Sequence, residues 1–313
     1  MPIPVALDVD TGVDDALALI LALRSPELAV RAVSCVAGNT SVEFATRNTL
    51  LVLDRLEARR DLRVARGAAQ PLARPLAPAG EVHGADGLGN TSALYPPSTR
   101  PYGMDGVALL LETIQAQPGA LTLIATGPMT NLAQAVAREP AAFRQLREIV
   151  QMGGAVAVPG NVSPHAEFNL WVDPEAAAAV FAAGVPLRLV PLDVTEQLVL
   201  TRARVRQLAQ ERDSGVFQFV RECTVLYFDF HQQRVGINGG HLHDPAAVTA
   251  AIHPEWFTWR RARLGIDTGE AERGRLRVEW PSEAGRDEAG TAQVAVGSEA
   301  ARVVDFIADR VCQ

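Results

Sequence analysis

Lysine is absent from this chain of 313 residues, so all 29 of its lysine-or-arginine positions are arginines. Lysine supplies the amine of Schiff-base and pyridoxal enzymes and the side chain that holds phosphate in a P-loop. The sequence therefore excludes these mechanisms. Its basic side chains are arginine and histidine alone.

Cysteines, long apolar runs and positive net charge are also lacking. The three cysteines, Cys35, Cys223 and Cys312, are odd in number and lack metal-site spacing, which predicts free thiols. No apolar stretch is long enough to cross a bilayer, and the amino terminus lacks signal-peptide features, so we expect a cytoplasmic protein without a membrane partner. The net charge of −7 argues against a nucleic-acid partner and favours a small ligand.

Alternating strand and helix signals predict one α/β domain over residues 1–313, and 48% hydrophobic residues suffice for a large core. The expected architecture is a Rossmann-like open, mostly parallel sheet flanked by helices. Strands are expected at 3–7, 29–36, 121–125, 147–152 and 187–190, and helices at 16–23, 43–59, 174–183, 201–210, 215–230, 245–252 and 298–311. Alternating residues predict added antiparallel strands near the carboxyl end, at 257–264, 275–280 and 291–296.

Four carboxylates lie within eight residues where the first expected strand ends. Asp8 and Asp10 point the same way because strand side chains alternate, and Gly12 permits a turn that brings Asp14 and Asp15 back toward them. Carboxylates so close together repel unless protons or a metal neutralise them. Oxygen ligands at a strand end favour Ca²⁺ or Mg²⁺ over Zn²⁺.

This acidic segment has three alternative roles, which agree with the sequence to different degrees. The acids could cap the following helix, because carboxylates are favoured at helix N-termini. An EF-hand loop starting at Asp8 needs an acid at its twelfth position, where this chain has Leu19, and needs a preceding helix. A phosphatase of the haloacid dehalogenase type also opens with DxD but usually needs a downstream lysine. The sequence disfavours the last two and leaves the cap open.

Polar side chains also end the other expected strands, and ligands of open α/β sheets bind at the carboxyl ends of strands. These ends supply Asp10, Asn39, Thr126 and Met152. Two polar loops, at 160–169 and 239–245, and an irregular segment rich in proline and glycine at 70–102 add further groups. We expect these segments to border one site.

Seven motifs follow one another along the chain: DVDTGVDDALAL, VAGNT, HGADGLG, ATGPMTNLA, MGG, GNVSPHAEFNLWVDPEAA and HDP. Each is weak alone, but their order and spacing together are specific. Over nearly its whole length the chain resembles the calcium-dependent nucleoside hydrolases of the inosine-uridine preferring type.

The resemblance implies a Ca²⁺ site held by the carboxylates of Asp10, Asp15 and Asp244 and by the backbone carbonyl of Thr126. It implies hydrolysis of the N-glycosidic bond of ribonucleosides to ribose and free base. The nucleophile would be a Ca²⁺-bound water with Asp10 as general base. A single attack by water predicts inversion at the anomeric carbon.

The resemblance also implies contacts to ribose, whose hydroxyls both donate and accept hydrogen bonds. Asp14 and Asn169 are expected at the 2'- and 3'-hydroxyls, Asn161 and Glu167 at the 5'-hydroxyl, and Asn39 and Met152 in the same pocket. Without the resemblance, the asparagines would be assigned to turns and the glutamate to the surface.

The leaving base needs a proton or another partner for its negative charge. His243, next to Asp244, is the expected leaving-group acid by resemblance. Tyr227 and His231 lie four residues apart, hence on one face of an expected helix, and are alternatives. His83 is expected in the pocket from a flexible loop, a further resemblance to the family.

His165 and His241 are expected on the surface. The presence of His243 favours broad activity on inosine and uridine, with a pyrimidine or purine preference left open. A non-catalytic nucleoside or ribose binder is the alternative from another class, although the intact carboxylates favour an enzyme. The resemblance also suggests a homodimer or homotetramer.

Overall fold

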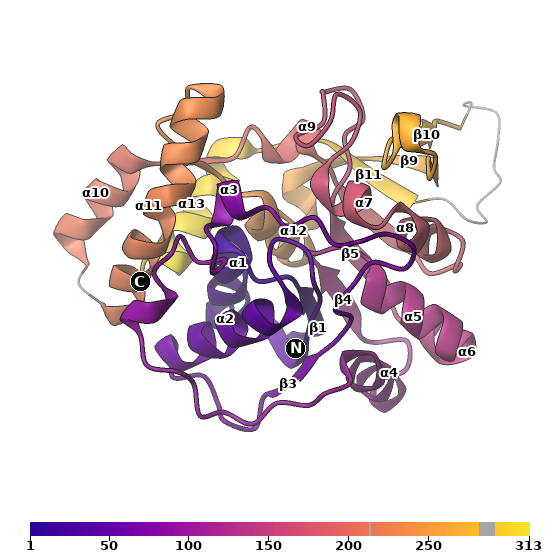
Figure 1. The fold of residues 1–313 in the computed structure, drawn as a ribbon, viewed down its shortest axis with the longest axis horizontal. Coiled ribbons are helices and arrows are strands. Elements are labelled where there is room, and N and C mark those ends of the chain that lie inside the picture. Colours follow the sequence, from indigo (N-terminus) through magenta and orange to yellow (C-terminus); the bar gives the residue numbers. More distant parts are fainter. Residues whose placement is uncertain (213, 282–291) are drawn as a thin grey trace.

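The computed structural model describes residues 1–212, 214–281 and 292–313 (Figure 1). Its strands are β1 (Ile3–Val9), β2 (Leu28–Cys35), β3 (Arg63–Arg66), β4 (Thr122–Ala125), β5 (Glu148–Met152), β6 (Leu187–Val190), β7 (Val199–Thr201), β8 (Gly239–His241), β9 (Phe257–Ile266), β10 (Leu276–Glu279) and β11 (Ala292–Ser298). Nine of these described strands form one sheet in the order β10-β9-β11-β6-β5-β4-β1-β2-β3, and β7 pairs with β8.

The sheet is parallel from β11 to β3, whereas β9 runs antiparallel to both β10 and β11. This confirms the expected mostly parallel sheet with antiparallel strands near the carboxyl end. The order β3-β2-β1-β4-β5-β6 reverses direction between β1 and β4. In doubly wound sheets this point opens a crevice at the carboxyl ends of the strands, where ligands bind.

Helices cover both faces of the sheet. One face carries α1 (Val13–Arg24), α2 (Val42–Arg55), α9 (Leu192–Thr195), α10 (Arg202–Glu211), α11 (Gly215–Val235), α12 (His243–Ile252) and α13 (Ala300–Val311). The other carries α4 (Gly106–Ala116), α5 (Thr130–Arg138), α6 (Pro140–Phe143) and α8 (Pro174–Phe181). Short segments complete the fold: α3 (Gly80–His83), α7 (Phe168–Val172) and the 3₁₀ turns at Ser92–Leu94, Pro254–Trp256 and Glu270–Glu272.

Helix α1 is buried on every side from Val13 to Ala22. From Ala16 to Leu23 its sequence is apolar all round, as expected for a helix enclosed by others, and it packs against α2, α12 and α13. This burial fixes the position of the acidic turn that precedes it. Among the described residues, no helix is long and apolar enough to cross a membrane.

The structure adds elements that the sequence patterns did not predict, among them α4, α9, β3 and the β7–β8 pair. Asp105 caps α4 by accepting a hydrogen bond from the N–H of Ala108 at 2.8 Å. Helix α11 extends to Val235, beyond the expected end at 230, and stops at Gly236, whose positive φ of 74° ends the helix. Thr291, the expected first residue of the last strand, lies outside the described residues.

Candidate functional site

Asp10 follows β1 and lies between the ends of the neighbouring strands β2 and β4. Its Oδ2 accepts a hydrogen bond from the N–H of Asn39 at 2.6 Å. A Cβ added at Gly38 would collide with that oxygen, and a Cβ at Gly127 would lie 2.9 Å from Oδ1. Both positions need glycine because the Asp10 carboxylate fills the space beside their backbone.

Asp15, in the first turn of α1, is oriented by three hydrogen-bond donors. Its Oδ2 accepts from the N–H of Gly12 at 2.9 Å and from Nδ2 of Asn39 at 3.0 Å. Its Oδ1 accepts from the hydroxyl of Thr126 at 2.7 Å. Asp15 thus caps α1, the role that the sequence left open, and also ties the helix to the ends of β2 and β4.

Asp14, Asp15 and Asp244 form a buried group in which one carboxylate oxygen from each lies within 4.8 Å of the others. Burial, and then the charge of Asp15, raise the pKa of Asp14 to about 8. Burial, followed by the charge of Asp14, raises the pKa of Asp244 well above its usual value. Buried carboxylates that resist ionisation in this way fit a hard cation, which would replace the missing solvation.

Two oxygens in this region are buried without a hydrogen-bond partner among the described residues: Oδ1 of Asp14 and Oδ1 of Asp10. Burial, and then Asp15, also raise the pKa of Asp10 well above its ordinary value. Within the described part of the chain, however, Asp10 does not belong to the close group of three carboxylates. Its direct contact with a metal stays a prediction.

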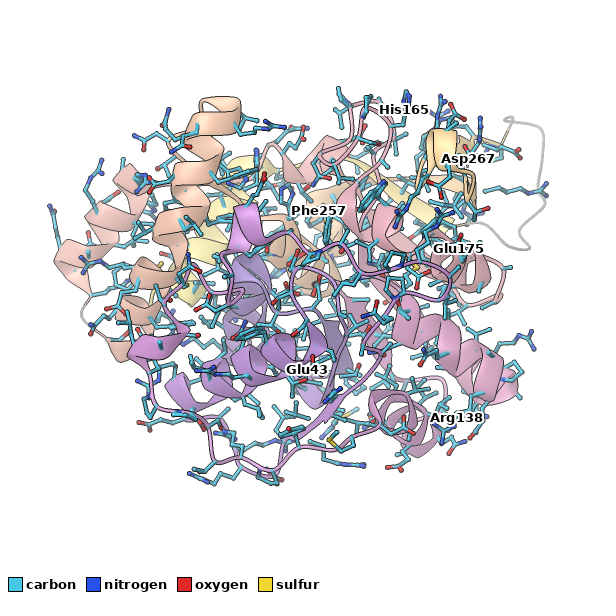
Figure 2. The ribbon with its side chains drawn as sticks, in the orientation of Figure 1. Glu43, Arg138, His165, Glu175, Phe257 and Asp267 are labelled. Atoms are coloured by element: carbon cyan, nitrogen blue, oxygen red, sulfur yellow. The ribbon has the colours of Figure 1, made fainter. Side chains whose placement is uncertain are left out.

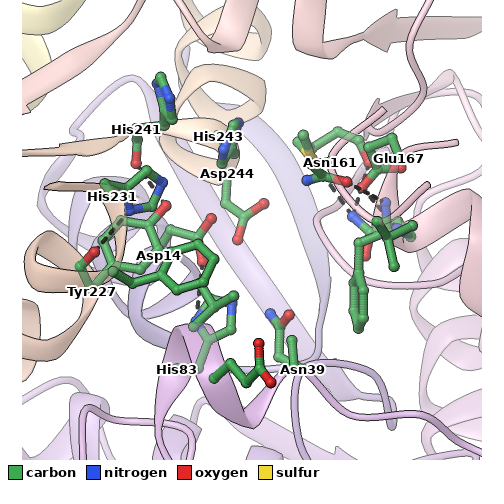
Figure 3. Close-up of a pocket in the computed structure, with 18 of the residues that line it drawn as sticks. Asp14, Asn39, His83, Asn161, Glu167, Tyr227, His231, His241, His243 and Asp244 are labelled. Atoms are coloured by element: carbon green, nitrogen blue, oxygen red, sulfur yellow. Dashed lines mark hydrogen bonds and ion pairs between the residues drawn. The ribbon is translucent and has the colours of Figure 1, made fainter. Parts of the chain in front are cut away.

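Asn161 and Glu167 lie together on one wall of the cavity (Figure 3), which Asn169 also lines. Glu167 caps α7: its Oε1 accepts from the N–H of Asn169 at 2.7 Å, and its Oε2 accepts from two further backbone N–H groups. Burial raises its pKa. Nδ2 of Asn169 donates to the carbonyl oxygen of Thr126 at 2.7 Å, which ties this wall to the end of β4.

Five rings form a continuous row along the other wall: His83, Tyr227, His231, His241 and His243. Successive ring centroids are 5.7, 4.4, 4.9 and 5.1 Å apart. Asp244 lies between His231 and the wall that carries Asn161 and Glu167 (Figure 3), and Oδ1 of Asp14 lies 3.8 Å from Nδ1 of His83. The rings come from α3, α11, β8 and α12, which are far apart in sequence.

The prediction that His241 lies on the surface is wrong. His241 is only 7% exposed, because residues 239–241 form β8, which pairs with β7 and carries the ring between His231 and His243. His165, by contrast, is exposed as predicted and lies at the periphery of the molecule (Figure 2).

Hydrogen bonds define the protons on two of these rings. The backbone N–H of Val13 donates to Nδ1 of His83 at 3.1 Å, so the proton of the neutral ring is on Nε2. Nδ1 of His231 lies 2.8 Å from the carbonyl oxygen of Tyr227, which can only accept, so the proton is on Nδ1 and Nε2 is an acceptor. Tyr227 itself donates its hydroxyl proton to the carbonyl oxygen of His241 at 2.9 Å.

Burial keeps the histidines of the row uncharged. It lowers the pKa of His83 to about 3 and that of His241 to about 4, and it lowers the pKa of His231 and His243 as well. The 3.8 Å approach of His83 Nδ1 to Asp14 is therefore not an ion pair at neutral pH. This wall offers neutral donors and acceptors.

A cavity of about 660 Å³ lies between the two walls. Twelve of the predicted site residues line it: Asp14, Asn39, His83, Thr126, Met152, Asn161, Glu167, Asn169, Tyr227, His231, His243 and Asp244. Asp10 and Asp15 lie beside these residues, linked to them through Asn39 and Thr126.

The sequence patterns did not identify several other lining residues: Phe168, Trp171, Glu196, Phe230, Arg234 and His241. Phe230 and Arg234 follow Tyr227 by three and seven positions, so the helical spacing already used for His231 could have found them. The structure nevertheless brings residues from distant segments of the chain together at one site, as the sequence predicts.

A family model described as inosine-uridine preferring nucleoside hydrolase matches residues 5–305. The chain belongs to this family, and it is an enzyme that hydrolyses ribonucleosides. It is 38% identical over 315 residues to the pyrimidine-specific ribonucleoside hydrolase RihA of Enterobacter sp. (strain 638), covering 100% of this chain and 99% of the relative. The RihA of Salmonella typhi is also 38% identical, with 99% of each chain covered.

Two solved structures share the fold. The plant nucleoside hydrolase PpNRh1 superposes with a TM-score of 0.93 at 33% identity, covering 100% of this chain and 99% of its own. The purine-preferring ribonucleoside hydrolase from Gardnerella vaginalis has a TM-score of 0.90 at 30% identity, with 99% and 98% covered. The names of these relatives differ in base preference, so the shared fold does not by itself fix the base.

Proposed function

We propose that this enzyme hydrolyses uridine and related ribonucleosides to ribose and free base with Ca²⁺ held at the carboxylates of α1 and α12. The observation that carries the proposal is the cavity itself. One side presents buried carboxylates with unpartnered oxygens, and the other presents a row of neutral rings. A nucleoside has the matching division, a polyhydroxylated sugar joined to a flat aromatic base.

The donor set fits a calcium ion. Ca²⁺ prefers carboxylate and carbonyl oxygens, and the residues proposed to hold it are Asp10, Asp15, Asp244 and the carbonyl of Thr126. When bound, the ion supplies a Lewis acid that makes a water molecule more acidic and holds sugar hydroxyls. Asp15 is already held in place by Gly12, Asn39 and Thr126, so the site needs little rearrangement.

Asp10 is the proposed general base. Its Oδ1 is buried without a hydrogen-bond partner among the described residues, which supports a role as proton acceptor. Asp10 takes the proton of the attacking water, which adds to the anomeric carbon as the bond to the base breaks. One displacement by water inverts that carbon, and no covalent sugar intermediate forms.

The ribose contacts are proposed from the residues that line the carboxylate side. Asp14 and Asn169 bind the 2'- and 3'-hydroxyls, Asn161 and Glu167 bind the 5'-hydroxyl, and Asn39 and Met152 complete the pocket. The oxygens of Glu167 already accept three backbone hydrogen bonds, but a carboxylate has about four acceptor positions, which leaves room for one hydroxyl.

His243 is the proposed partner of the leaving base. Because burial keeps it neutral, it stabilises the developing negative charge through an N–H hydrogen bond, as neutral imidazoles do in other enzymes. Tyr227 is less suited to this role, since its hydroxyl proton is donated to His241. His83 presents a second N–H and His231 an acceptor, so both can contact polar edges of the base.

Uridine is the proposed substrate because it satisfies both lines of comparison. The family model is described as inosine-uridine preferring, and the RihA relatives are named pyrimidine-specific. Inosine separates the two descriptions: broad activity would include it, and pyrimidine specificity would exclude it. The suggested homodimer or homotetramer stays a prediction that light scattering of the purified protein would test.

The test is release of free ribose from uridine, cytidine, inosine and adenosine by the purified protein, with Ca²⁺ and after treatment with a chelator. We expect calcium-dependent release with uridine among the best substrates. Tight binding of nucleosides without release from any of them would contradict catalysis and support the nucleoside-binder alternative.

A further inference from the structure

Buried threonines beyond the first turn of the longer helices of this protein share one arrangement. Each donates its hydroxyl to the carbonyl four residues earlier, at 2.6 to 2.9 Å. These residues are Thr46, Thr49, Thr113, Thr224 and Thr249. Thr195, at the end of α9, differs from them, since its Oγ1 lies 2.7 Å from Nδ1 of His243, 48 residues later in the chain.

The local backbone explains the different direction of this hydroxyl. The carbonyl of Pro191, four residues before Thr195, already accepts the N–H groups of Val194 and Thr195 at 3.0 and 3.1 Å. Thr195 is fully buried, and within the described part of the chain His243 Nδ1 is the partner found for its hydroxyl. The hydroxyl of Thr195 therefore forms its hydrogen bond with the imidazole of His243.

The donor of the hydrogen bond between Thr195 and His243 can be assigned, because the hydroxyl proton of Thr195 needs an acceptor. If Nδ1 of His243 were the donor, the buried O–H of Thr195 would have no acceptor, which is costly in a protein interior. With Thr195 as donor, Nδ1 accepts and the ring proton is on Nε2. His83 is the same tautomer, with its proton on Nε2, because the N–H of Val13 donates to its Nδ1.

Helix α9 also makes hydrogen bonds to the loop that carries Asn161, on the other side of the cavity from His243. The carboxylate of Asp193 accepts from the N–H groups of Val156 and Ala157 at 2.8 and 2.7 Å. These two residues begin the loop that leads to Asn161. One short helix thus fixes both the loop that leads to Asn161 and the orientation of His243.

We propose that Thr195 is a positioning residue whose hydroxyl holds His243 in the form that presents Nε2–H to the leaving base. The proposal rests on the function proposed above, in which His243 stabilises that base. Thr195 does not line the cavity and acts only through His243. Its removal should slow the departure of a poor leaving group without harming the steps carried out at the sugar.

The test compares two substrates with Thr195→Val, which keeps the side-chain shape and removes the hydroxyl. Uracil is a poor leaving group, whereas p-nitrophenolate leaves p-nitrophenyl β-D-ribofuranoside without assistance. We expect kcat for uridine to fall by about tenfold to a hundredfold, as for other residues that orient a histidine, with a smaller change in KM. The kcat for the nitrophenyl riboside should stay near that of the unaltered protein.

Two further variants complete the test. Thr195→Ser keeps the hydroxyl and is expected to restore the uridine rate. Thr113→Val removes a buried hydroxyl in α4, remote from the cavity, and is expected to change neither substrate's rate. If Thr195→Val does not fold, Thr195→Ala carries the same expectations.

Three results would overturn the proposal: an unchanged uridine rate in Thr195→Val, equal losses on both substrates, or a Thr195→Ser variant as slow as Thr195→Val. Failure of the underlying function is distinct from these results. It would show as no ribose release from uridine by the unaltered protein.

Discussion

The two walls of the cavity are built in different ways. The wall proposed to bind the sugar (the sugar wall) gathers Asp10, Asn39 and Thr126 from the ends of adjacent strands. Asn39 and Thr126 donate to Asp15 at 3.0 and 2.7 Å, and the N–H of Asn39 donates to Asp10 at 2.6 Å. The wall proposed to bind the base (the base wall) gathers five rings from four elements. Four of these residues make single hydrogen bonds to backbone or hydroxyl groups, whereas Nδ1 of His241 is buried without a partner among the described residues.

Burial acts on both walls but with opposite consequences for function. It raises the pKa of the carboxylates and lowers the pKa of the histidines, so both sets are pushed toward their neutral forms. In the proposed function, a bound cation restores the negative charge of the sugar wall. The base wall needs none, because neutral imidazoles already donate and accept hydrogen bonds.

Removing the proposed base should have the largest effect. Asp10→Asn is expected to lower kcat for uridine by about ten-thousandfold, because an amide cannot take the proton of water. The matched control is Asp8→Asn on the same strand, whose carboxylate bonds to Ser34 and Asn131. Steady-state kinetics should show the control retaining most of its activity. Similar losses in both variants would show that the effect is a general disturbance of β1.

Removing a hydroxyl from the sugar of the substrate should cause the second largest loss of rate. 2'-Deoxyuridine is expected to react about a thousandfold more slowly than uridine, because Asp14 and Asn169 would be left with unpaired buried groups. 5'-Deoxyuridine should lose less, since Asn161 is exposed to water. Measured kcat/KM values that fall equally for both analogues would contradict this arrangement of the ribose wall.

On the base wall, His243→Gln is expected to lower kcat for uridine by about a hundredfold. Tyr227→Phe should have a much smaller effect, since the tyrosine proton is donated to the carbonyl of His241. The two variants measured side by side rank the candidate partners of the leaving base. A larger loss in Tyr227→Phe would reassign that role to the tyrosine.

The smallest expected effect is on stability. The carboxyl of Asp14 has a pKa of about 8 in the folded protein, against 3.8 for an ordinary aspartate. The folded state therefore holds a proton that the unfolded chain has lost between these values, and metal-free stability should decrease as pH rises from about 5 to 8.

Ca²⁺ should offset this loss because it competes with that proton. Thermal unfolding is expected to show a rise in Tm of about 5 °C on adding Ca²⁺ at pH 8 and a smaller rise at pH 5.5. A larger stabilisation at the lower pH would contradict the assignment of the cation to these carboxylates.

The acidic turn of the sugar wall could be predicted from the sequence because Asp10, Asp14 and Asp15 follow a strand–turn–helix pattern within eight positions. The roles of the asparagines, Glu167 and Thr126 there were expected only from the family resemblance. The parallel sheet, the acidic turn and the later strand ends all carry local signals. The role of Gly38 and Gly127 could not be foreseen in this way. It depends on how closely two neighbouring strands approach Asp10, which only the assembled sheet defines.

The base wall was harder to predict because its rings meet through tertiary packing. His241 was expected on the surface, since nothing local shows that Gly239 and Gly240 begin a strand paired with β7. The bond from Thr195 to His243 spans 48 residues and has no sequence signal. Long-range contacts of this kind escape periodicity and motif analysis.

The most direct test of the proposed function is a Ca²⁺ titration of chelator-treated protein, with the initial rate of ribose release from uridine as the readout. We expect negligible release without the ion and a rise that saturates at one Ca²⁺ per chain. Full activity in the chelator-treated protein, unchanged by added Ca²⁺, would contradict the claim that the buried carboxylates act through a bound cation.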